Sequence, residues 1–243
     1  MSVFHTHAKQ ALWKVTKNLI RDFSELEVMQ SGNNLSVARF VSMSKVKSRE
    51  LLERELRALN FRSISFSDDP IPQENGIHIL VGELEGLENL SKALPFFGCY
   101  IVQIKISNGI TQILAASATF PALGVMCYAE DGQGAWTERY DDKLQTSSAR
   151  LRSSGQKNIT NTLVNHALSS QDERFPNSRH FGSFLYDLSA FAFGKLDAIL
   201  IPSSLNILTF ALELFAKEAG GYIIKKDNGD VIASGAALGA YLK

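Results

Sequence analysis

The sequence has little cysteine, no excess of charge of either sign and no uninterrupted apolar run long enough to cross a membrane. Its 243 residues include only Cys99 and Cys127, without CxxC spacing, which argues against a disulfide framework and against a cysteine-based zinc site. The 25 basic and 25 acidic residues cancel, so no overall field draws the chain to nucleic acid or to an anionic membrane. A reducing cytoplasm is the simplest compartment, and no nucleic-acid partner is indicated.

A targeting or membrane segment is also missing from the pattern. The first residues, MSVFHTHAKQALWKV, lack the apolar stretch of a signal peptide. The most apolar window, Leu196–Ala216, is interrupted by Pro202 and Glu213, so it predicts a strand, a turn and a helix instead of a membrane span. We therefore expect a cytoplasmic protein. Its length suits one large core or two modest subdomains.

The N-terminal quarter is helical by periodicity. Apolar residues recur at helical spacing over residues 6–23 and again over about 46–59, with lysine and arginine on the opposite faces. His5 and His7 precede the first helix. A solvated pair is favoured over a metal-ligand pair there, because the two lie at a terminus and share a face only on a strand.

The middle of the chain changes to strand periodicity. Asn108–Gly109 lies between two alternating runs, which is a strong signal for a β-hairpin. We expect a short helix to open within Gly82–Leu90. Strands are predicted, mostly as an antiparallel meander, at Arg62–Phe66, Ile77–Val81, Cys99–Ser107, Ile110–Ala118, Leu123–Ala129 and Gly134–Arg139.

The last third predicts alternating helices and strands. The polar, serine-rich segment Lys143–Asn158 favours a boundary or exposed loop, and residues 165–180 favour a surface loop. These patterns predict two parts of one compact unit, an N-terminal α+β subdomain over 1–150 and a C-terminal α/β subdomain over 151–243. The elements predicted in the second part are a strand at Ile159–Val164, a helix at Ser183–Phe193, a strand at Leu196–Ile201, a helix at Leu205–Ala219 and a last helix from Ala236.

Two stretches carry a family resemblance. GSFLYDLSAFAFGKLDAI and the later KEAGG resemble the inositol monophosphatases, the lithium-sensitive, magnesium-dependent sugar phosphatases, in order and spacing over about 40 residues. Glu130–Trp136 (EDGQGAW) resembles a hairpin motif of the same family. The resemblance implies an α+β fold, a layered α-β-α-β-α sandwich shared with fructose-1,6-bisphosphatase, and a homodimer. The matching residues are Gly182, Ser183, Asp187, Leu188, Ala192, Gly194, Asp197, Ala198 and Lys217–Gly221.

The resemblance also implies a metal site, and most of its ligands are missing from this sequence. The family holds two or three Mg²⁺ ions with carboxylates, because a hard cation needs anionic oxygen ligands. The main motif, D-P-I/L-D-G-T-x-N-F, matches Gly82–Leu90. Gly82 takes the place of the first aspartate, Glu85 that of the second and Leu87 that of the threonine, whereas Gly86 is kept.

Three further segments of the family's site also depart from its pattern. The strand-end glutamate pair corresponds to Asp68 and Asp69, which either bind a cation or cap a loop. The acidic position at the start of the last long helix falls on Leu208, and the early acidic segment corresponds to Asn33–Lys45, which contains no acid. Glu85, Glu83 and Asp68 or Asp69 are left to hold one loose ion, while Gly86–Leu87 can present backbone N–H groups to an anion.

Three hypotheses follow from this sequence. The first is a phosphatase-fold protein with impaired or lost catalysis that binds or regulates a partner; Mg²⁺, expected for the family, is then weak or absent. The second is a weak or altered Mg²⁺-dependent phosphomonoesterase acting on inositol phosphate or a related sugar phosphate. In it Asp68, Asp69, Glu83 and Glu85 rebuild a different site, and Gly182, Ser183 and Asp187 form the substrate-side motif. The third, a nucleic-acid or transcription-complex partner, is implied only by the resemblance, because some bacterial members of the family associate with the RNA synthesis machinery; the neutral charge neither supports nor excludes it.

Overall fold

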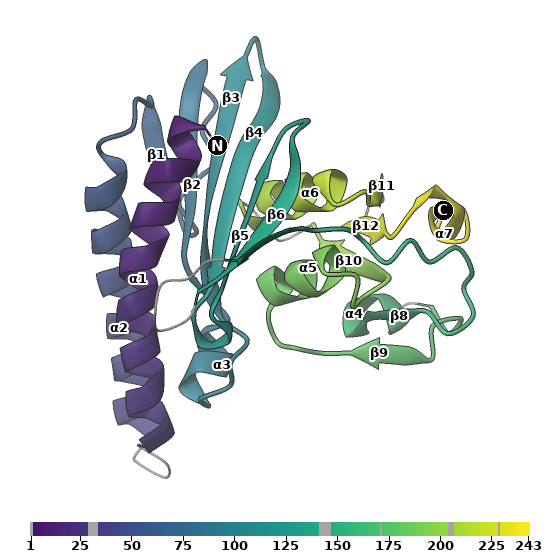
Figure 1. Ribbon diagram of the computed structural model, residues 1–243, viewed down its shortest axis with the longest axis horizontal. Coiled ribbons are helices and arrows are strands. Elements are labelled where there is room, and N and C mark those ends of the chain that lie inside the picture. The colour runs from purple at the N-terminus through teal and green to yellow at the C-terminus, as the bar shows by residue number, and fades with distance from the viewer. Residues whose placement is uncertain (1, 29–33, 141–146, 171, 204–206, 228) are drawn as a thin grey trace.

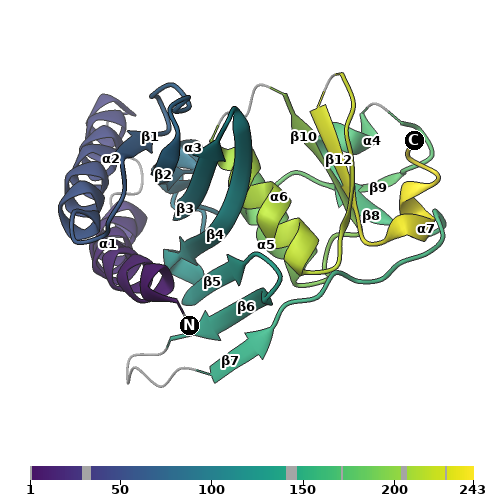
Figure 2. The same ribbon diagram turned by 90° about the horizontal axis from the view of Figure 1, so that it is seen from above.

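The computed structural model describes residues 2–28, 34–140, 147–170, 172–203, 207–227 and 229–243. The elements form five layers, which both views show from one side of the molecule to the other (Figures 1 and 2). An outer pair of helices, α1 (Val3–Val28) and α2 (Asn34–Leu56), covers the first sheet. Helices α5 (Phe184–Ala192) and α6 (Leu208–Glu218) lie between the two sheets. The second sheet and helices α4 (His166–Ser169) and α7 (Ala236–Gly239) complete the α+β sandwich that the resemblance implied.

The first sheet is a meander in chain order. Only β1 and β2 pair in parallel among its described strands; the other pairs are antiparallel. Asn108 and Gly109 both have positive φ, 53° and 76°, at the β3–β4 turn, which confirms the predicted hairpin. The strands are β1 (Ser63–Phe66), β2 (Gly76–Glu85), β3 (Gly98–Ser107), β4 (Ile110–Phe120), β5 (Val125–Glu130), β6 (Gly134–Arg139) and β7 (Ser147–Arg150).

The second sheet has the order β11-β12-β10-β8-β9. Its β10 pairs antiparallel with β12 and parallel with β8. Every described strand of this sheet follows residue 162, although the proposed division of the chain at residue 150 stays a prediction. The strands are β8 (Leu163–Asn165), β9 (Asn177–Arg179), β10 (Ala198–Pro202), β11 (Tyr222–Ile224) and β12 (Gly229–Ala233).

Apolar clusters fill both faces of the first sheet. Neighbouring residues on one strand point to opposite faces, so Ala115 on β4 joins the cluster under α1 and α2 and Ala116 joins the cluster under α5 and α6. A third cluster lies between the second sheet and the helices α4 and α7, around Val164, Leu200 and Leu238. The helix layer between the two sheets is therefore covered on both sides.

Three sequence predictions about element boundaries were wrong. Helix α2 begins at Asn34 instead of residue 46, because Ser44 takes a buried position that an apolar-periodicity search does not count. The strand predicted at Ile77–Val81 is longer, because β2 continues to Glu85 and ends only where Gly86 takes a φ of 82°. The short helix α3 (Leu87–Ser91) then begins within Gly82–Leu90, as predicted. The segments expected as loops contain β7, α4 and β9. The predicted start of the helix at Leu205 lies outside the described residues.

Two other expectations concern the N-terminus and membranes. The prediction of a solvated His5 was wrong: its side chain is buried, and its Nδ1 lies 3.0 Å from the Ser117 hydroxyl of β4. Burial, together with the nearby α-amino charge, lowers the pKa of His5 to about 4, against a weaker opposing effect of the Ala129 backbone. Among the described residues, none of the helices combines the length and apolar character needed to cross a membrane.

Candidate functional site

The end of β2 carries Gly82, where the resemblance places a first metal-binding aspartate. The pairing of β2 with β3 is irregular between Gly82 and Glu85, and Tyr100 of β3 lies directly opposite Gly82. A Cβ atom built on Gly82 would lie 1.9 Å from Tyr100 Cε1. The ring of Tyr100 therefore fills the space that a side chain at position 82 would need. The sequence analysis missed Tyr100, because only cross-strand pairing brings it there.

Lys45 of α2 lies between two of the predicted site carboxylates. Its Nζ is 2.8 Å from Asp68 Oδ2 and 3.4 Å from Glu83 Oε1. The other Glu83 oxygen, Oε2, accepts hydrogen bonds from the Ser67 hydroxyl at 2.9 Å and from the Ser67 amide at 3.3 Å. The Lys45 hydrogen bond and charge lower the pKa of Asp68. Sequence reasoning missed Lys45, although it ends the segment matched to an acidic motif.

Asp69 makes contacts different from those of Asp68. Its Oδ2 accepts a hydrogen bond from the Phe66 amide at 2.8 Å and lies 3.3 Å from Arg49 Nη2. The Arg49 guanidinium also stacks 4.1 Å from the centre of the Phe66 ring. The sequence left open whether the aspartate pair binds a cation or caps a loop. Asp69 has the geometry of a loop cap.

Glu85 points to the N-terminus of α5, where the second motif begins. Its Oε1 accepts a hydrogen bond from the Phe184 amide at 3.0 Å, and the Ser183 hydroxyl donates to its Oε2. Ser183 is the N-cap of α5, and its Oγ also accepts from the Tyr186 amide at 3.1 Å. Burial raises the pKa of Glu85 to about 7 against the hydrogen bonds from Ser183 and α5, and the charge of Asp187 adds to the rise.

Asp187 lies one turn into α5 and is also buried. Its Oδ2 accepts from the Asn165 side chain at 3.3 Å, while its Oδ1 has no hydrogen-bond partner among the described residues. Burial raises the pKa of Asp187 to about 7, against the weaker effect of Asn165. The structure thus brings Glu85, Ser183 and Asp187 together at the start of α5, apart from the group formed by Lys45, Asp68 and Glu83.

The other predicted positions have packing roles. Leu87 is half-buried against the cluster under α1 and α2, and Leu208 is buried in the cluster around α5 and α6. Gly86 and Gly182 have positive φ, 82° and 70°, and a Cβ built on Gly182 would lie 3.0 Å from Asn89 Oδ1. The Asn89 side-chain amide donates to Phe96 O at 2.7 Å and Phe181 O at 2.8 Å, so it ties α3 to the segment before α5.

The two remaining matched motifs meet in space. The Glu218 carboxylate of KEAGG accepts hydrogen bonds from the Gly132 amide at 2.9 Å and the Gly134 amide at 2.7 Å, which form the turn between β5 and β6. Lys217 forms an ion pair with Asp131 of the same turn at 2.6 Å. The residues Glu218 and Lys217 of this motif therefore hold α6 against the turn between β5 and β6.

Comparison with solved structures agrees with this topology. The extragenic suppressor protein SuhB from Bartonella henselae superposes with a TM-score of 0.77 and 21% identity over 99% of this chain and 98% of that chain. Inositol monophosphatase II from Staphylococcus aureus gives 0.74 with 14% identity over 98% and 93%. SuhB from Mycobacterium tuberculosis gives 0.72 with 19% identity over 97% and 91%. The chain has the inositol monophosphatase fold. No family model and no curated protein matches its sequence.

The residues present do not fit the magnesium ions that the inositol monophosphatase fold implies. Among the described residues, no three histidine, cysteine or acidic side chains converge as a metal-binding group. The carboxylates that remain are already occupied: Asp68 and Glu83 by Lys45, Asp69 by Arg49, and Glu85 by α5. A Mg²⁺ ion needs six oxygen ligands at about 2.1 Å, so these contacts would have to be broken before it could bind.

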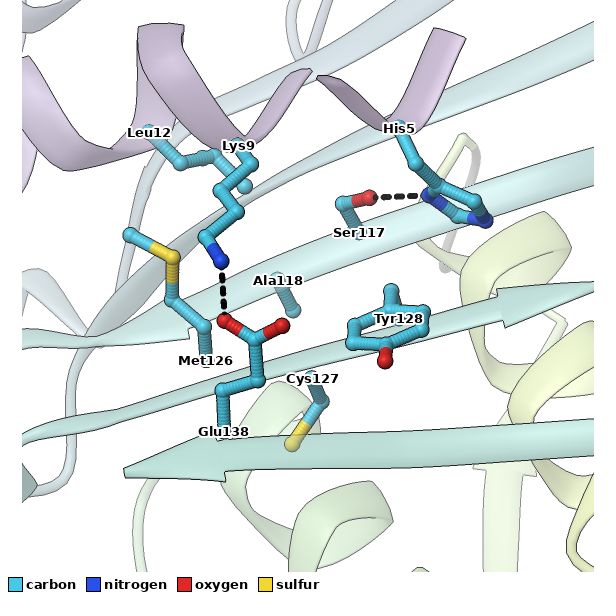
Figure 3. A pocket seen from close by; sticks show the side chains of 9 residues that line it. All are labelled: His5, Lys9, Leu12, Ser117, Ala118, Met126, Cys127, Tyr128 and Glu138. Carbon is cyan, nitrogen blue, oxygen red and sulfur yellow. Dashed lines mark hydrogen bonds and ion pairs between the residues drawn. The ribbon is translucent and has the colours of Figure 1, made fainter. Parts of the chain in front are cut away.

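The described residues also form hollows, and two of these lie beside α1 and beside α5. Figure 3 shows one between α1 and the sheet, where Lys9 pairs with Glu138 and His5 approaches Ser117; it has about 10 Å³ of room, enough for one water molecule. The other is a cleft of about 500 Å³ beside α5. The described residues lining it include no acid, and they comprise Phe120, Leu123, Val125, Arg139, Leu163, Arg179, Phe181, Tyr186, Ser189, Ala190, Phe193, Lys195 and Leu196.

Proposed function

We propose that this protein keeps the inositol monophosphatase fold without the phosphatase chemistry and works, as a homodimer, in binding or regulation. The observation that carries the proposal is the Tyr100 ring beside Gly82. Gly82 has no side-chain atom to bind a metal ion, and the ring fills the space that such a side chain would need. Arg49 and Lys45 support it, since they neutralise carboxylates that a metal ion would need. Fold persists where site chemistry is lost, so a binding role is compatible with this fold.

The ligand that we propose is an anion of the sugar-phosphate class. The cleft beside α5 supports this class, because Arg139, Arg179 and Lys195 line it without a carboxylate among its described residues. These three side chains put positive charge on the wall of the cleft, where an anion would be attracted. Phe181 and Tyr186, which flank the Ser183 motif, give the cleft an apolar wall for a sugar ring.

One experiment tests both halves of this proposal. The purified protein is incubated with inositol monophosphate and millimolar Mg²⁺, and released phosphate and melting temperature are measured. We expect the wild-type protein to release phosphate no faster than the Glu85→Ala variant does. We also expect the wild-type protein to melt at a higher temperature with inositol monophosphate than with inositol. Hydrolysis that Glu85→Ala abolishes would overturn the loss of catalysis. A light-scattering mass of 26.8 kDa, that of one chain, would contradict the homodimer.

A second candidate is a weak or altered Mg²⁺-dependent phosphomonoesterase. Glu85 and Asp187 favour it, because two buried carboxyl groups with pKa near 7 suit proton transfer at neutral pH. Crystals soaked with Mn²⁺ distinguish the candidates. Metal density between Asp68, Asp69, Glu83 and Glu85 would favour the phosphomonoesterase, and flat calorimetry at millimolar metal would count against it.

A further inference from the structure

We propose that the ammonium group of Lys45 takes the place of a divalent cation, so that the carboxylates of Asp68 and Glu83 are neutralised by the chain itself and the protein needs no metal ion there. The inference concerns how this site is held together. It rests on the loss of metal binding in the proposed function, and its test measures metal binding and melting temperature, so its failure can be told from a failure of the proposed anion binding.

The position of Lys45 supports the replacement. Its Nζ lies within ion-pair distance of oxygens from two carboxylates, Asp68 just after β1 and Glu83 on β2. Bridging two carboxylates from neighbouring strands is the role that a bound cation would have at this point. An ammonium 2.8 Å from one oxygen occupies that place, so a metal ion bridging the same two oxygens would have to displace it.

Glu83 shows why a cation is required. Its side chain is 1% exposed, and a carboxylate so deeply buried needs a positive partner or a proton. Ser67 satisfies one oxygen, Oε2, with two donors. The other, Oε1, has no hydrogen bond of good geometry and faces Lys45, the one cation that the described residues bring within 4 Å of it.

Lys45 is suited to stay charged in this position. Its side chain is 25% exposed, so water still reaches the ammonium. Burial opposes its protonation, but the hydrogen bond and charge of Asp68 and the charge of Glu83 outweigh burial and raise its pKa. One turn further along α2, Arg49 pairs with Asp69 in the same way, so α2 supplies a cation to each member of the aspartate pair.

The test removes the ammonium and looks for metal binding. Wild type, Lys45→Ala and the control Lys47→Ala, which alters an exposed lysine of the same helix, are melted with EDTA or with millimolar Mn²⁺, and Mn²⁺ binding is measured by calorimetry. We expect the melting temperatures of wild type and Lys47→Ala to be the same with EDTA and with Mn²⁺, and we expect no Mn²⁺ binding by either in calorimetry. Lys45→Ala should melt lower in EDTA, recover with Mn²⁺ and bind Mn²⁺ at least about tenfold more tightly than wild type. Adding Asp68→Asn should abolish that gain.

Two outcomes would overturn the inference. One is Mn²⁺ binding by wild type that Glu83→Gln removes, since the site would then hold a metal despite Lys45. The other is a Lys45→Ala protein that is as stable as wild type and still indifferent to Mn²⁺. If Lys45→Ala does not fold, Lys45→Met is used in its place, because methionine keeps the apolar part of the side chain without the charge. The calorimetry of the wild-type protein tests the inference without either variant.

Discussion

At the scale of single residues, the approach of Gly82 to Tyr100 makes a direct prediction. Gly82→Ala should lower the free energy of unfolding by about 1–3 kcal/mol, the usual cost of overpacking a core. The reason is the 1.9 Å between the new Cβ and Tyr100 Cε1, and Tyr100 is only 2% exposed, so its ring has little room to turn away. Urea unfolding followed by far-UV circular dichroism measures the change.

Gly235 provides the matched control, because its backbone is extended and no atom lies within 4 Å of a Cβ built there. Gly235→Ala should cost clearly less than Gly82→Ala. Replacing the ring as well, in Gly82→Ala with Tyr100→Leu, should cost less than the two single changes added together. If Gly82→Asp is as stable as wild type, the ring does not exclude a side chain at position 82, and the support for lost metal binding fails with it.

The buried carboxyl of Glu85 predicts a pH dependence of stability. Its pKa is about 7 in the folded protein and 4.5 ordinarily, so the folded state holds the proton more tightly than the unfolded state. Its contribution is therefore present below about pH 4.5 and is lost as the pH rises to about 7, by about 3 kcal/mol in all. Glu85→Gln should remove that loss. Urea unfolding of both proteins from about pH 4 to pH 8 measures the difference.

Comparing wild type with Glu85→Gln cancels the contributions that other groups make to the pH dependence of stability. His5 makes one of opposite sign, because its lowered pKa makes stability rise with pH between about 4 and 6.5. Glu88→Gln changes an exposed glutamate three residues away and should leave the wild-type profile intact. A profile for Glu85→Gln that is parallel to that of wild type would show that Glu85 titrates normally.

At the scale of elements, the sequence predicts what depends on local pattern. Asn108–Gly109 fixes the β3–β4 hairpin because both residues accept positive φ, and Ser183 predicts the start of α5 because its side chain caps the helix. The first half of α2 escaped detection, since its core-facing Ser44 bonds to the buried Asp22 of α1 at 2.7 Å, a tertiary contact with no local signature.

The candidate site shows the same limit at element scale. Gly82, Leu87 and Leu208 carry no side-chain oxygen at positions where the resemblance implies polar groups, and the sequence alone shows this. It does not show which side chains lie beside these positions. Tyr100 reaches Gly82 through the pairing of β2 with β3, and Lys45 reaches Glu83 through the packing of α2 on β2, and neither contact has a fixed spacing along the chain.

At the scale of the whole molecule, the shared first sheet predicts that the helix layers unfold together. Helix α1 contacts β4 through Thr16 and Thr119, whose hydroxyls are 2.7 Å apart, and α6 packs on the opposite face of β4 and β5. Adjacent residues of β4 belong to the two different clusters. Loss of packing on one face therefore loosens the strand that supports the other, although a chain of this length often unfolds in stages.

Leu212→Ala tests this coupling from the α6 side. Leu212 is fully buried, so the change should cost about 2–5 kcal/mol. In a Trp136→Phe background, the fluorescence of Trp13 on α1 reports the opposite layer, where its ring packs edge-on against Tyr140. The urea midpoint should fall equally by Trp13 fluorescence and by circular dichroism, as it should for Leu19→Ala on the buried face of α1. If Leu212→Ala leaves the urea midpoint measured by Trp13 fluorescence unchanged, the two faces of the first sheet unfold independently. The α6 layer would then have lost packing without loosening β4 and the α1 layer beyond it.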